Sequence, residues 1–598
     1  MGETGGSRSA ASSAAGSRRR RSRHPFGDVS RREPGHPHHA VGSSCWPDHQ
    51  GKQGRRCHVR VGRAIPRGDR PALCAQRSSA RGLRVTLFDL VKSQAVDHPD
   101  RLAIIHHDHR ITYSALIAEV DRIARGLQAR GVRHGDRVLT LAGNTPDVVA
   151  IYLAVSRLGA IYVPMSTSFR EREVRFVLAN SEPKVVIVAA SHIDAAVSWE
   201  LSGSAEIIVL GGDGANGLTT FEELGLGDEP VSVVSVGDED GLLLCYTSGT
   251  TSTPKPVLHS QRSEMYNAHT YAEVWRLGPD DKGIVCLPLA WVYGLSTTTA
   301  ALLVSGGTVV LLDRFHPVEV IDAIEAVEAT AMWGTMSMYT KLLEVIKDRG
   351  DVDLSSLRVV NNGGEPCPAP LVEEFERHAG VQLLGSYATS EARPIMVVRP
   401  GDTEAPEGTS GKLVPGAEIR LVAENGTEIG PGEPGLALLR CPGMMTEYYR
   451  QPELTAERLT ADGWLRTGDI LKSNSDGYWF VVGRQSEMII RSGVNIAPAE
   501  VESALAAHPN VADVAVIGVP DSRSGESIRA YIVAAGTERP QPDELRQFLA
   551  GQLAAFKVPQ EFVFADELPR TDRGKVDRNS LRRGIAGAEG DLVAPTAS

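Results

Sequence analysis

Short apolar runs alternate with amphipathic stretches after Val85, and this alternation limits the fold more than any other feature of the sequence. Arg137–Leu141 predicts a strand and Thr145–Leu158 a helix. A longer helix is predicted over Thr112–Arg130, with Thr112 as its N-cap. Such alternation favours an α/β fold of layered helices and largely parallel sheets. Further strands are predicted at Ile161–Pro164, Pro183–Ala189 and Glu206–Leu210.

The pattern changes after Pro415, where short strand-like pieces are separated by Gly, Pro and Asn. This texture is typical of a smaller, more antiparallel β subdomain. Helices are expected again near the C-terminus, with a strand between them. The predicted strands are Glu418–Val422, Gly435–Arg440, Gly477–Val482 and Ala512–Val519, and the predicted helices are Pro498–His508 and Leu545–Leu553.

A chain of 598 residues is too long for one hydrophobic core. We expect an extension over residues 1–84, a large N-terminal domain over 85–483 and a small α+β C-terminal domain over 484–598. The large domain would contain the layered sheets and the β subdomain.

Residues 1–84 are rich in Arg, Ser, Gly, Pro and His, with the run Arg18–Arg21 and no apolar periodicity. Such a segment cannot bury enough surface to fold alone, so we predict a disordered extension. It lacks the apolar stretch of a secretory signal. A transit peptide, a basic nucleic-acid arm and an over-long start assignment remain open. For the whole chain, a net charge of −11 and 5% aromatic residues disfavour nucleic acid as a partner.

Two further features bear on location. The seven cysteines are widely spaced without a C-x-x-C pair, which predicts reduced thiols in a cytoplasmic protein. Gly283–Leu312 has no charged residue and is long enough to cross a bilayer. Pro288 and several glycines interrupt it, so we expect a buried strand–helix–strand unit and no membrane span.

A hydroxyl-rich loop is the strongest local signal. The apolar strand Gly241–Cys245 leads into Tyr246–Lys255, which holds six Ser or Thr residues and ends in a lysine. Hydroxyls, backbone N–H groups and an ammonium can all donate to phosphate oxygens. The Walker A pattern is absent. The loop therefore predicts phosphate binding of another kind.

This loop resembles the phosphate-binding signature of the adenylate-forming superfamily, which includes acyl- and aryl-CoA synthetases, peptide synthetase adenylation domains and luciferases. Ser252 and Pro256 stand where that signature usually has glycines. The resemblance covers about Val85 to Arg582. Other segments resemble the remaining motifs in the family's order: Pro288–Leu295, Gly363–Pro366, Tyr387–Glu391, Arg466–Asp469, Gly483–Glu502 and Pro569–Lys575.

The resemblance implies an enzyme that uses ATP to convert a carboxylic acid to an acyl-adenylate and then transfers the acyl group to coenzyme A. Its implied catalytic residues are Lys575, Glu391 and Thr247. Lys575 would stabilise charge that builds on the phosphoryl oxygens, and Glu391 would hold Mg²⁺. The implied ATP-binding residues are Thr247, Ser248, Gly249, Thr250, Thr251, Lys255, Gly363, Gly364, Glu365, Pro366, Tyr387, Ala388, Ser390, Asp469, Arg484 and Lys575.

In the family the small domain is a mobile lid that rotates between the two half-reactions. The implied pivot is Ser486, where Asp or Lys is usual. Ser492 and Gly493 belong to the segment that is implied to form part of the thiol tunnel. A hinge needs residues that absorb changes in φ and ψ.

Motif position also indicates the acid pocket. Trp291 and Tyr293 would narrow an apolar slot, which favours an aromatic or modest-length acid over a long fatty chain. Arg393 either reads a second carboxylate or has a structural role. No carboxylate occurs in Pro288–Leu295, which disfavours an amino-acid substrate. The candidate pocket residues are Trp291, Tyr293, Gly294, Asn361, Asn362, Ala388 and Arg393.

Two other functions compete with a coenzyme A ligase. One is a stand-alone ligase that loads a separate carrier protein. The other is a weakened paralogue that binds nucleotide without turnover. The departures from the family motifs at Ser252, Pro256 and Ser486 favour this alternative.

Overall fold

The structure is a computed structural model, and it describes residues 85–199, 205–212, 218–226, 230–232, 234–247, 254–365, 369–521, 523–536, 538–571 and 575–584. By its internal contacts the chain divides into Met1–Ser79 and Ala80–Ser598. All the described residues belong to the second unit, where the strands that they contain form four sheets.

Sheet A has a parallel centre and antiparallel strands at both edges. Its first and last strands in space are β16 and β2. In spatial order the strands are β16 (Lys412–Leu413), β15 (Ala392–Val397), β14 (Leu383–Thr389), β13 (Val359–Gly363), β12 (Ala331–Gly334), β10 (Lys282–Val285), β11 (Thr308–Leu311), β1 (Leu102–His106) and β2 (His109–Thr112).

Sheet B is parallel from β8 to β7, and β9 and β19 extend it in antiparallel pairing. In spatial order its strands are β19 (Glu447–Tyr448), β9 (Lys255–Ser260), β8 (Gly241–Thr247), β4 (Ile161–Met165), β3 (Arg137–Leu141), β5 (Val185–Ala189), β6 (Glu206–Leu210) and β7 (Thr219–Thr220).

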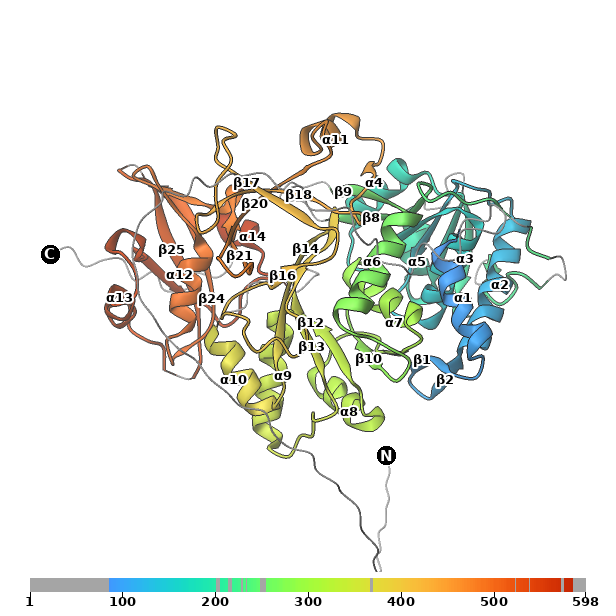
Figure 1. Ribbon diagram of the computed structural model, residues 1–598, viewed down its shortest axis with the longest axis horizontal. Coiled ribbons are helices and arrows are strands. Elements are labelled where there is room, and N and C mark those ends of the chain that lie inside the picture. Colours follow the sequence, from blue (N-terminus) through green and yellow to red (C-terminus); the bar gives the residue numbers. More distant parts are fainter. Residues whose placement is uncertain are drawn as a thin grey trace, which may run out of the picture. The chain divides into compact units, whose positions relative to one another are not determined.

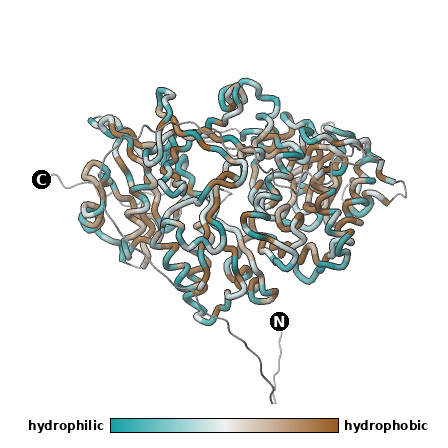
Figure 2. Tube along the Cα trace, viewed as in Figure 1, coloured by the Kyte–Doolittle hydropathy of each residue, from teal (hydrophilic) through white to brown (hydrophobic). Residues whose placement is uncertain are grey.

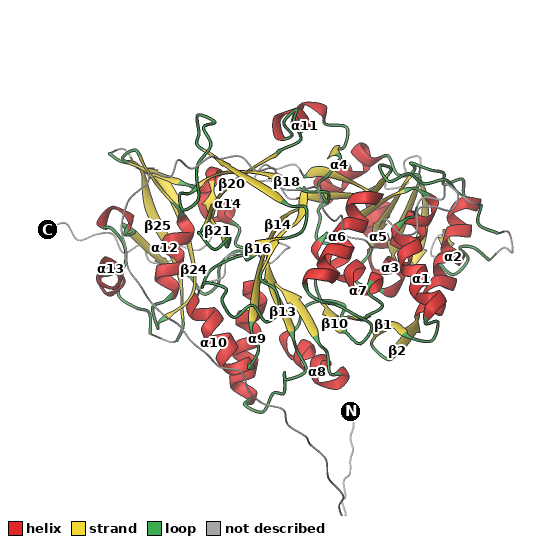
Figure 3. Cartoon of the chain, viewed as in Figure 1, coloured by secondary structure: helices red, strands yellow, loops and turns green. Residues whose placement is uncertain are grey.

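Helices accompany these two sheets, as Figure 3 shows for α1 to α3, α6 and α7 beside the strands. The hydrophobic segments run mainly through the interior of this region (Figure 2), where they form the largest core cluster. The helices are α1 (Leu87–Asp97), α2 (Tyr113–Ala129), α3 (Pro146–Leu158), α4 (Glu171–Ser181), α5 (Ile193–Ser198), α6 (Gln261–Val274), α7 (Ala300–Val304), α8 (Pro317–Val327), α9 (Met336–Arg349), α10 (Ala369–Ala379) and α11 (Pro452–Arg458), with the short turns η1 (Ala190–His192) and η3 (Tyr293–Thr299), the latter π-helical.

Sheet C is antiparallel, and it is the smaller β subdomain that the sequence predicts. Its order is β17 (Glu418–Val422), β18 (Gly435–Arg440), β20 (Leu465–Ser473) and β21 (Trp479–Arg484). The predicted strand Gly477–Val482 begins two residues later, because Gly477 has a φ of 81° and belongs to the preceding turn.

The residues after Arg484 build sheet D and their own hydrophobic clusters. The predicted helix Leu545–Leu553 is shifted toward the N-terminus, because Pro542 supplies the first helical position and Gln541 the cap. The elements are β22 (Ile489–Arg491), β23 (Val494–Ile496), β24 (Val511–Asp521), β25 (Gly525–Ala534), β26 (Glu561–Phe564), α12 (Pro498–Ala506), α13 (Pro542–Ala550), α14 (Arg578–Arg583), η4 (Gln485–Glu487) and η5 (Ala555–Lys557).

The other elements that the sequence predicted lie close to their expected bounds. Thr112 caps α2, its hydroxyl accepting a hydrogen bond from the backbone of Ala115, and Thr145 caps α3 in the same way. Gly283–Leu312 covers β10 except for its first residue, together with η3, α7 and β11, which confirms the strand–helix–strand prediction. Among the described residues, no helix combines the length and apolar character that a bilayer crossing needs.

Candidate nucleotide and acid site

Strand β14 separates two faces of the site and lies in the middle of the ribbon in Figure 1. The Ser386 hydroxyl donates to the side-chain oxygen of Asn361 on β13 (3.0 Å). The next residue, Tyr387, donates from its hydroxyl to Asp469 of sheet C (2.6 Å). Because consecutive strand residues point to opposite faces, one face of β14 meets the predicted acid pocket and the other meets the predicted nucleotide pocket.

Asp469 is the centre of the nucleotide side. It is 5% exposed, and its two carboxylate oxygens accept hydrogen bonds from Tyr387 and from Nε of Arg484 (2.7 Å). Asp469 and Arg484 face each other in the β20–β21 register. Asp469 raises the pKa of Arg484, and burial followed by Asp469 raises the pKa of Tyr387. Tyr387, Asp469 and Arg484, three of the predicted ATP-binding residues, thus form one hydrogen-bonded cluster.

Lys575 lies beside the turn that follows β13. Gly364 has a φ of 83°, and a Cβ at that position would lie 3.8 Å from Nζ of Lys575. Glu365 accepts a hydrogen bond from the Ser337 backbone (3.0 Å) and lies 3.7 Å from the guanidinium of Arg570. Burial raises the pKa of Glu365, while Arg570 and Lys575 oppose that shift. The C-terminal motif Pro569–Lys575 therefore meets the predicted ATP-binding segment Gly363–Pro366.

A further group joins the phosphate-loop lysine to the predicted metal ligand. Thr247 ends β8 and faces Lys255, the first residue of β9. The ammonium of Lys255 lies 6.0 Å from the ring centroid of Tyr448, and the Tyr448 hydroxyl donates to Glu391 (2.8 Å). Burial and the nearby Arg458 lower the pKa of Lys255, while Glu391 opposes that shift. The carboxylate and the ammonium thus share Tyr448 as a neighbour.

On the acid side, the hydroxyl of Tyr293 is held by Asn361. This hydroxyl donates to the side chain of Asn361 (3.0 Å), and a Cβ on Gly363 would lie 2.8 Å from the hydroxyl oxygen. Trp291 is 9% exposed and packs edge-on against Phe169, with ring centroids 5.8 Å apart.

Three other residues predicted for the site also belong to these elements. Gly294 accepts hydrogen bonds at its carbonyl from Thr298 and Thr299 within η3. Asn362 donates to the carbonyl of Glu365 (3.0 Å), and Ala388 is half-buried on β14.

Arg393 lies in the interior, in a polar network behind Glu391. It is 1% exposed and forms an ion pair with Glu264, which is equally buried. Glu264 also accepts from the hydroxyls of Tyr152 (2.8 Å) and Ser296 (2.5 Å). One terminal nitrogen of the Arg393 guanidinium, Nη2, donates to both Glu264 and Ser296.

The same network reaches Ser390, the residue before Glu391. The carbonyl of Ser390 lies 2.8 Å from Nε2 of His259 and 3.2 Å from Nη1 of Arg393. Burial and the neighbouring guanidinium hold the pKa of His259 well below its ordinary value, so the imidazole is neutral. The backbone that carries Glu391 is therefore anchored from the interior.

The predicted hinge residues lie on the C-terminal side of sheet C. Ser486 belongs to η4, directly after β21. Ser492 and Gly493 form the turn between β22 and β23, with φ values of 51° and 79°. The backbone N–H of Ser492 donates to Ser524 (2.7 Å).

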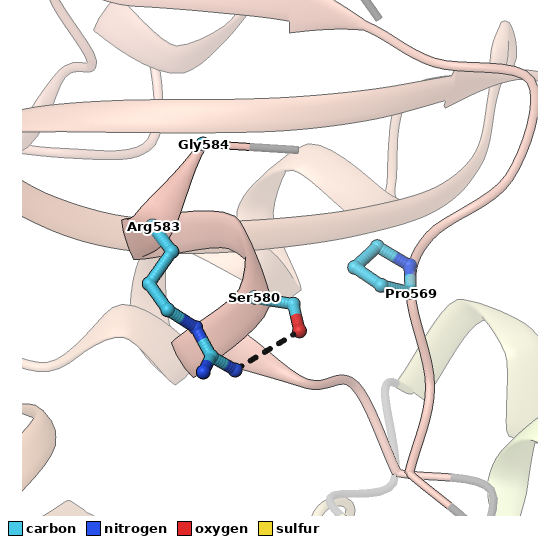
Figure 4. Close-up of a pocket in the computed structure, with 4 residues that line it drawn as sticks. All are labelled: Pro569, Ser580, Arg583 and Gly584. Carbon is cyan, nitrogen blue, oxygen red and sulfur yellow. Dashed lines mark hydrogen bonds between the residues drawn. The ribbon is translucent and has the colours of Figure 1, made fainter. Parts of the chain in front are cut away.

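Part of the predicted phosphate loop and of the predicted ATP-binding segment Gly363–Pro366 lies outside the described residues: Ser248, Gly249, Thr250, Thr251, Ser252 and Pro366. A surface pocket does occur in the C-terminal region, between the chain at Pro569 and the end of α14 (Figure 4). Pro569, Ser580, Arg583 and Gly584 line it, and none of them is a predicted site residue.

Sequence reasoning did not single out three residues that contact the site. Tyr448 and Ser386 carry no motif signal of their own, and Ser386 could have been found only from its place before Tyr387. Arg570 belongs to the Pro569–Lys575 motif, so a signal for it was present.

Comparison with known proteins identifies the family. The model of the family described as "AMP-binding enzyme" matches residues 91–449. The model described as "AMP-binding enzyme C-terminal domain" matches residues 500–575. The chain belongs to the AMP-binding enzyme family. This result confirms the adenylate-forming resemblance and the α/β fold with a small C-terminal domain.

Characterised relatives of this AMP-binding enzyme include coenzyme A ligases. An indoleacetate–CoA ligase of Aromatoleum aromaticum is 35% identical over 84% of this chain and 98% of its own length. A feruloyl-CoA synthase of an Amycolatopsis species is 35% identical over 81% of this chain and 96% of its own. The crystal structure of ATP-bound MatB from Rhodopseudomonas palustris matches with a TM-score of 0.77 and 30% identity, covering 83% of this chain and 99% of that one.

Proposed function

We propose that this AMP-binding enzyme activates an aromatic carboxylic acid and transfers it to coenzyme A. The chain is an ATP-dependent acid–thiol ligase: acid and ATP give an acyl-adenylate and pyrophosphate, and the thiol of coenzyme A then displaces AMP to give the thioester. The proposal adds the class of acid, the metal and the role of each residue.

The approach of Lys575 to Gly364 carries the proposed roles. This approach places a cation at the turn after β13. Strand β13 pairs with β14, and β14 carries Tyr387 of the Tyr387–Asp469 cluster. Negative charge builds on the phosphoryl oxygens when a carboxylate attacks the α-phosphate. An ammonium held there stabilises that charge more than it stabilises the bound substrates, and so it lowers the barrier.

The other predicted ATP-binding residues have side chains that suit the parts of a nucleotide. Asp469 is a buried acceptor that can exchange its present donors for the two ribose hydroxyls. The half-buried ring of Tyr387 offers a face for adenine, and Lys255 would supply an ammonium to the phosphates. Glu391 supplies the carboxylate oxygen that Mg²⁺ prefers, and the bound ion would neutralise phosphate charge.

Two observations support an aromatic acid. The two relatives named above act on indoleacetate and ferulate, as their names state. In this chain Tyr293 is held by Asn361, and Trp291 by Phe169, so the segment has rigid aromatic walls.

The test is acid-dependent exchange of labelled pyrophosphate into ATP with Mg²⁺, over aryl, arylalkanoic, short-chain, long-chain and dicarboxylic acids. We expect aromatic acids to exceed long-chain acids by at least roughly tenfold, the scale of a mismatch in an apolar pocket. Faster exchange with long-chain acids would reject the acid class. Product analysis with coenzyme A alone should show thioester, and a strict need for a carrier protein would reject the acceptor.

We further propose domains at 85–483 and 484–598, a rotation about Ser486 between the two half-reactions and a cytoplasmic location. Ser486 lies two residues after the end of β21, at the start of the region with its own core. Ser486→Pro, which fixes φ, should spare pyrophosphate exchange and block thioester formation. Equal loss of both steps would reject the rotation.

A further inference from the structure

The β1–β2 hairpin brings two imidazoles to one carboxylate, away from the residues described above; it is labelled at the lower right of Figure 1. Nε2 of His106 lies 2.8 Å from Oδ1 of Asp313, and Nε2 of His107 lies 3.1 Å from the same oxygen. The three ligand atoms all lie within 4.8 Å of one another. In the part of the chain that the structure describes, no other three His, Cys, Asp or Glu side chains converge in this way.

Backbone geometry explains why adjacent histidines face the same group. Neighbouring strand residues normally point to opposite faces. His107 is the first turn residue and has a φ of 50°, which breaks the alternation. The imidazole centroids are therefore only 4.2 Å apart, with their planes tilted by 53°. A left-handed backbone at a non-glycine residue costs on the order of 1–3 kcal/mol and tends to occur at functional sites.

Asp313 is held on a separate support. It follows β11, which pairs in parallel with β1 so that His106 lies opposite Leu311. The intervening Leu312 donates its N–H to Val285 (3.0 Å) and accepts at its carbonyl from Asn144 (2.9 Å). The carboxylate and the two imidazoles thus come from two tethered strands, and this arrangement limits how far they can separate.

These donors suit a transition metal. Zn²⁺ binds imidazole nitrogen and carboxylate oxygen at about 2.0–2.2 Å in tetrahedral geometry, which sets neighbouring ligand atoms roughly 3.3 Å apart. The two nitrogen–oxygen distances here, 2.8 and 3.1 Å, are about 0.5 and 0.2 Å shorter than that spacing. Magnesium and calcium prefer oxygen donors alone. Side chains of His107 and Asp313 are 60% exposed, so an ion can enter from solvent and keep a water ligand.

We propose that His106, His107 and Asp313 form a binding site for Zn²⁺ or a similar divalent transition metal, separate from the Mg²⁺ position proposed at Glu391.

The test is calorimetric titration of the chelator-treated full chain with Zn²⁺ alone, in wild type, in H106A/H107A and in D313N. The matched control is H109A, because His109 faces His106 across the hairpin but is not among the converging ligands. Removing ligands should weaken this site at least roughly 100-fold, since even indirect partners of a metal contribute 10–100-fold. Histidines in residues 1–84, such as His38 and His39, are unchanged throughout and cancel in the comparison.

We expect wild type and H109A to bind one equivalent more than H106A/H107A and D313N. X-ray absorption should show nitrogen or oxygen neighbours at about 2.0–2.1 Å. Acid-dependent pyrophosphate exchange should stay within twofold in every variant, which verifies folding independently of zinc. Equal stoichiometry and affinity in all four proteins, including no binding by any, overturns the proposal, as does an equal loss in H109A.

Discussion

Two buried carboxylates in this molecule have opposite surroundings. Glu264 and its partner Arg393 are each 1% exposed, and hydroxyls from α3 and η3 complete the network. Asp469 is 5% exposed, but its partner Arg484 keeps a side chain that is 46% exposed. The first pair has no route to solvent through its partner, whereas the second can exchange its partner for a ligand. A paired charge in the interior acts as a scaffold, and one at an edge can bind.

The largest effect should come from breaking the interior pair. Glu264→Gln leaves the guanidinium of Arg393 buried without its counter-charge, which typically costs about 3–5 kcal/mol. We expect a lower urea denaturation midpoint and no large change in KM for ATP at a temperature where the variant is folded. A midpoint equal to wild type would contradict the scaffold role.

Lys575→Ala tests the edge side of the comparison. Loss of one electrostatic donor to the transition state should lower the rate of adenylation by roughly 10²–10³, about 2.7–4 kcal/mol. The urea midpoint should not change. Near-normal pyrophosphate exchange would remove Lys575 from the mechanism, and Lys557→Ala, a lysine bound to Glu500 elsewhere, is the matched control.

Asp469→Asn should separate binding from stability. Hydrogen bonds to a charged group contribute about 1.5–3 kcal/mol, so KM for ATP should rise roughly 10–100-fold. Stability should change by less than about 1 kcal/mol, because the partner is solvent-screened. A large loss of stability with unchanged KM would mean that Asp469 resembles Glu264 after all.

The smallest effect concerns the pH profile. The pKa of Lys255 is lowered by burial and Arg458, so the ammonium loses its proton at a lower pH than an exposed lysine. The charged form binds phosphate, and kcat/KM for ATP should therefore fall as the pH rises through that lowered pKa. Lys255→Arg stays charged and should move this fall to higher pH. An unmoved alkaline limb would assign the titration to another group.

The sequence predicted local structure better than partners. Periodicity and caps placed α2, α3, the strands β3, β4, β5, β6 and β8 of sheet B, and the strands β17, β18 and β21 of sheet C, because these signals come from neighbouring residues. Tyr448 contacts Glu391 across 57 residues, and Arg393 contacts Glu264 across 129. No spacing rule connects such positions, since the contacts exist only once the sheets are assembled. For that reason the two interpretations of Arg393 could not be separated by motif position.

The alternation along β14 has a consequence for redesign. Ser386 and Tyr387 are joined by one peptide bond, so their Cα atoms are about 3.8 Å apart, yet they contact groups on opposite faces. A substitution at 386 that moves the strand moves the tyrosine as well. Altered acid preference introduced there should bring altered ATP affinity with it. Preference is better tuned in η3, whose residues belong to another part of the backbone, and the two properties then become separately adjustable.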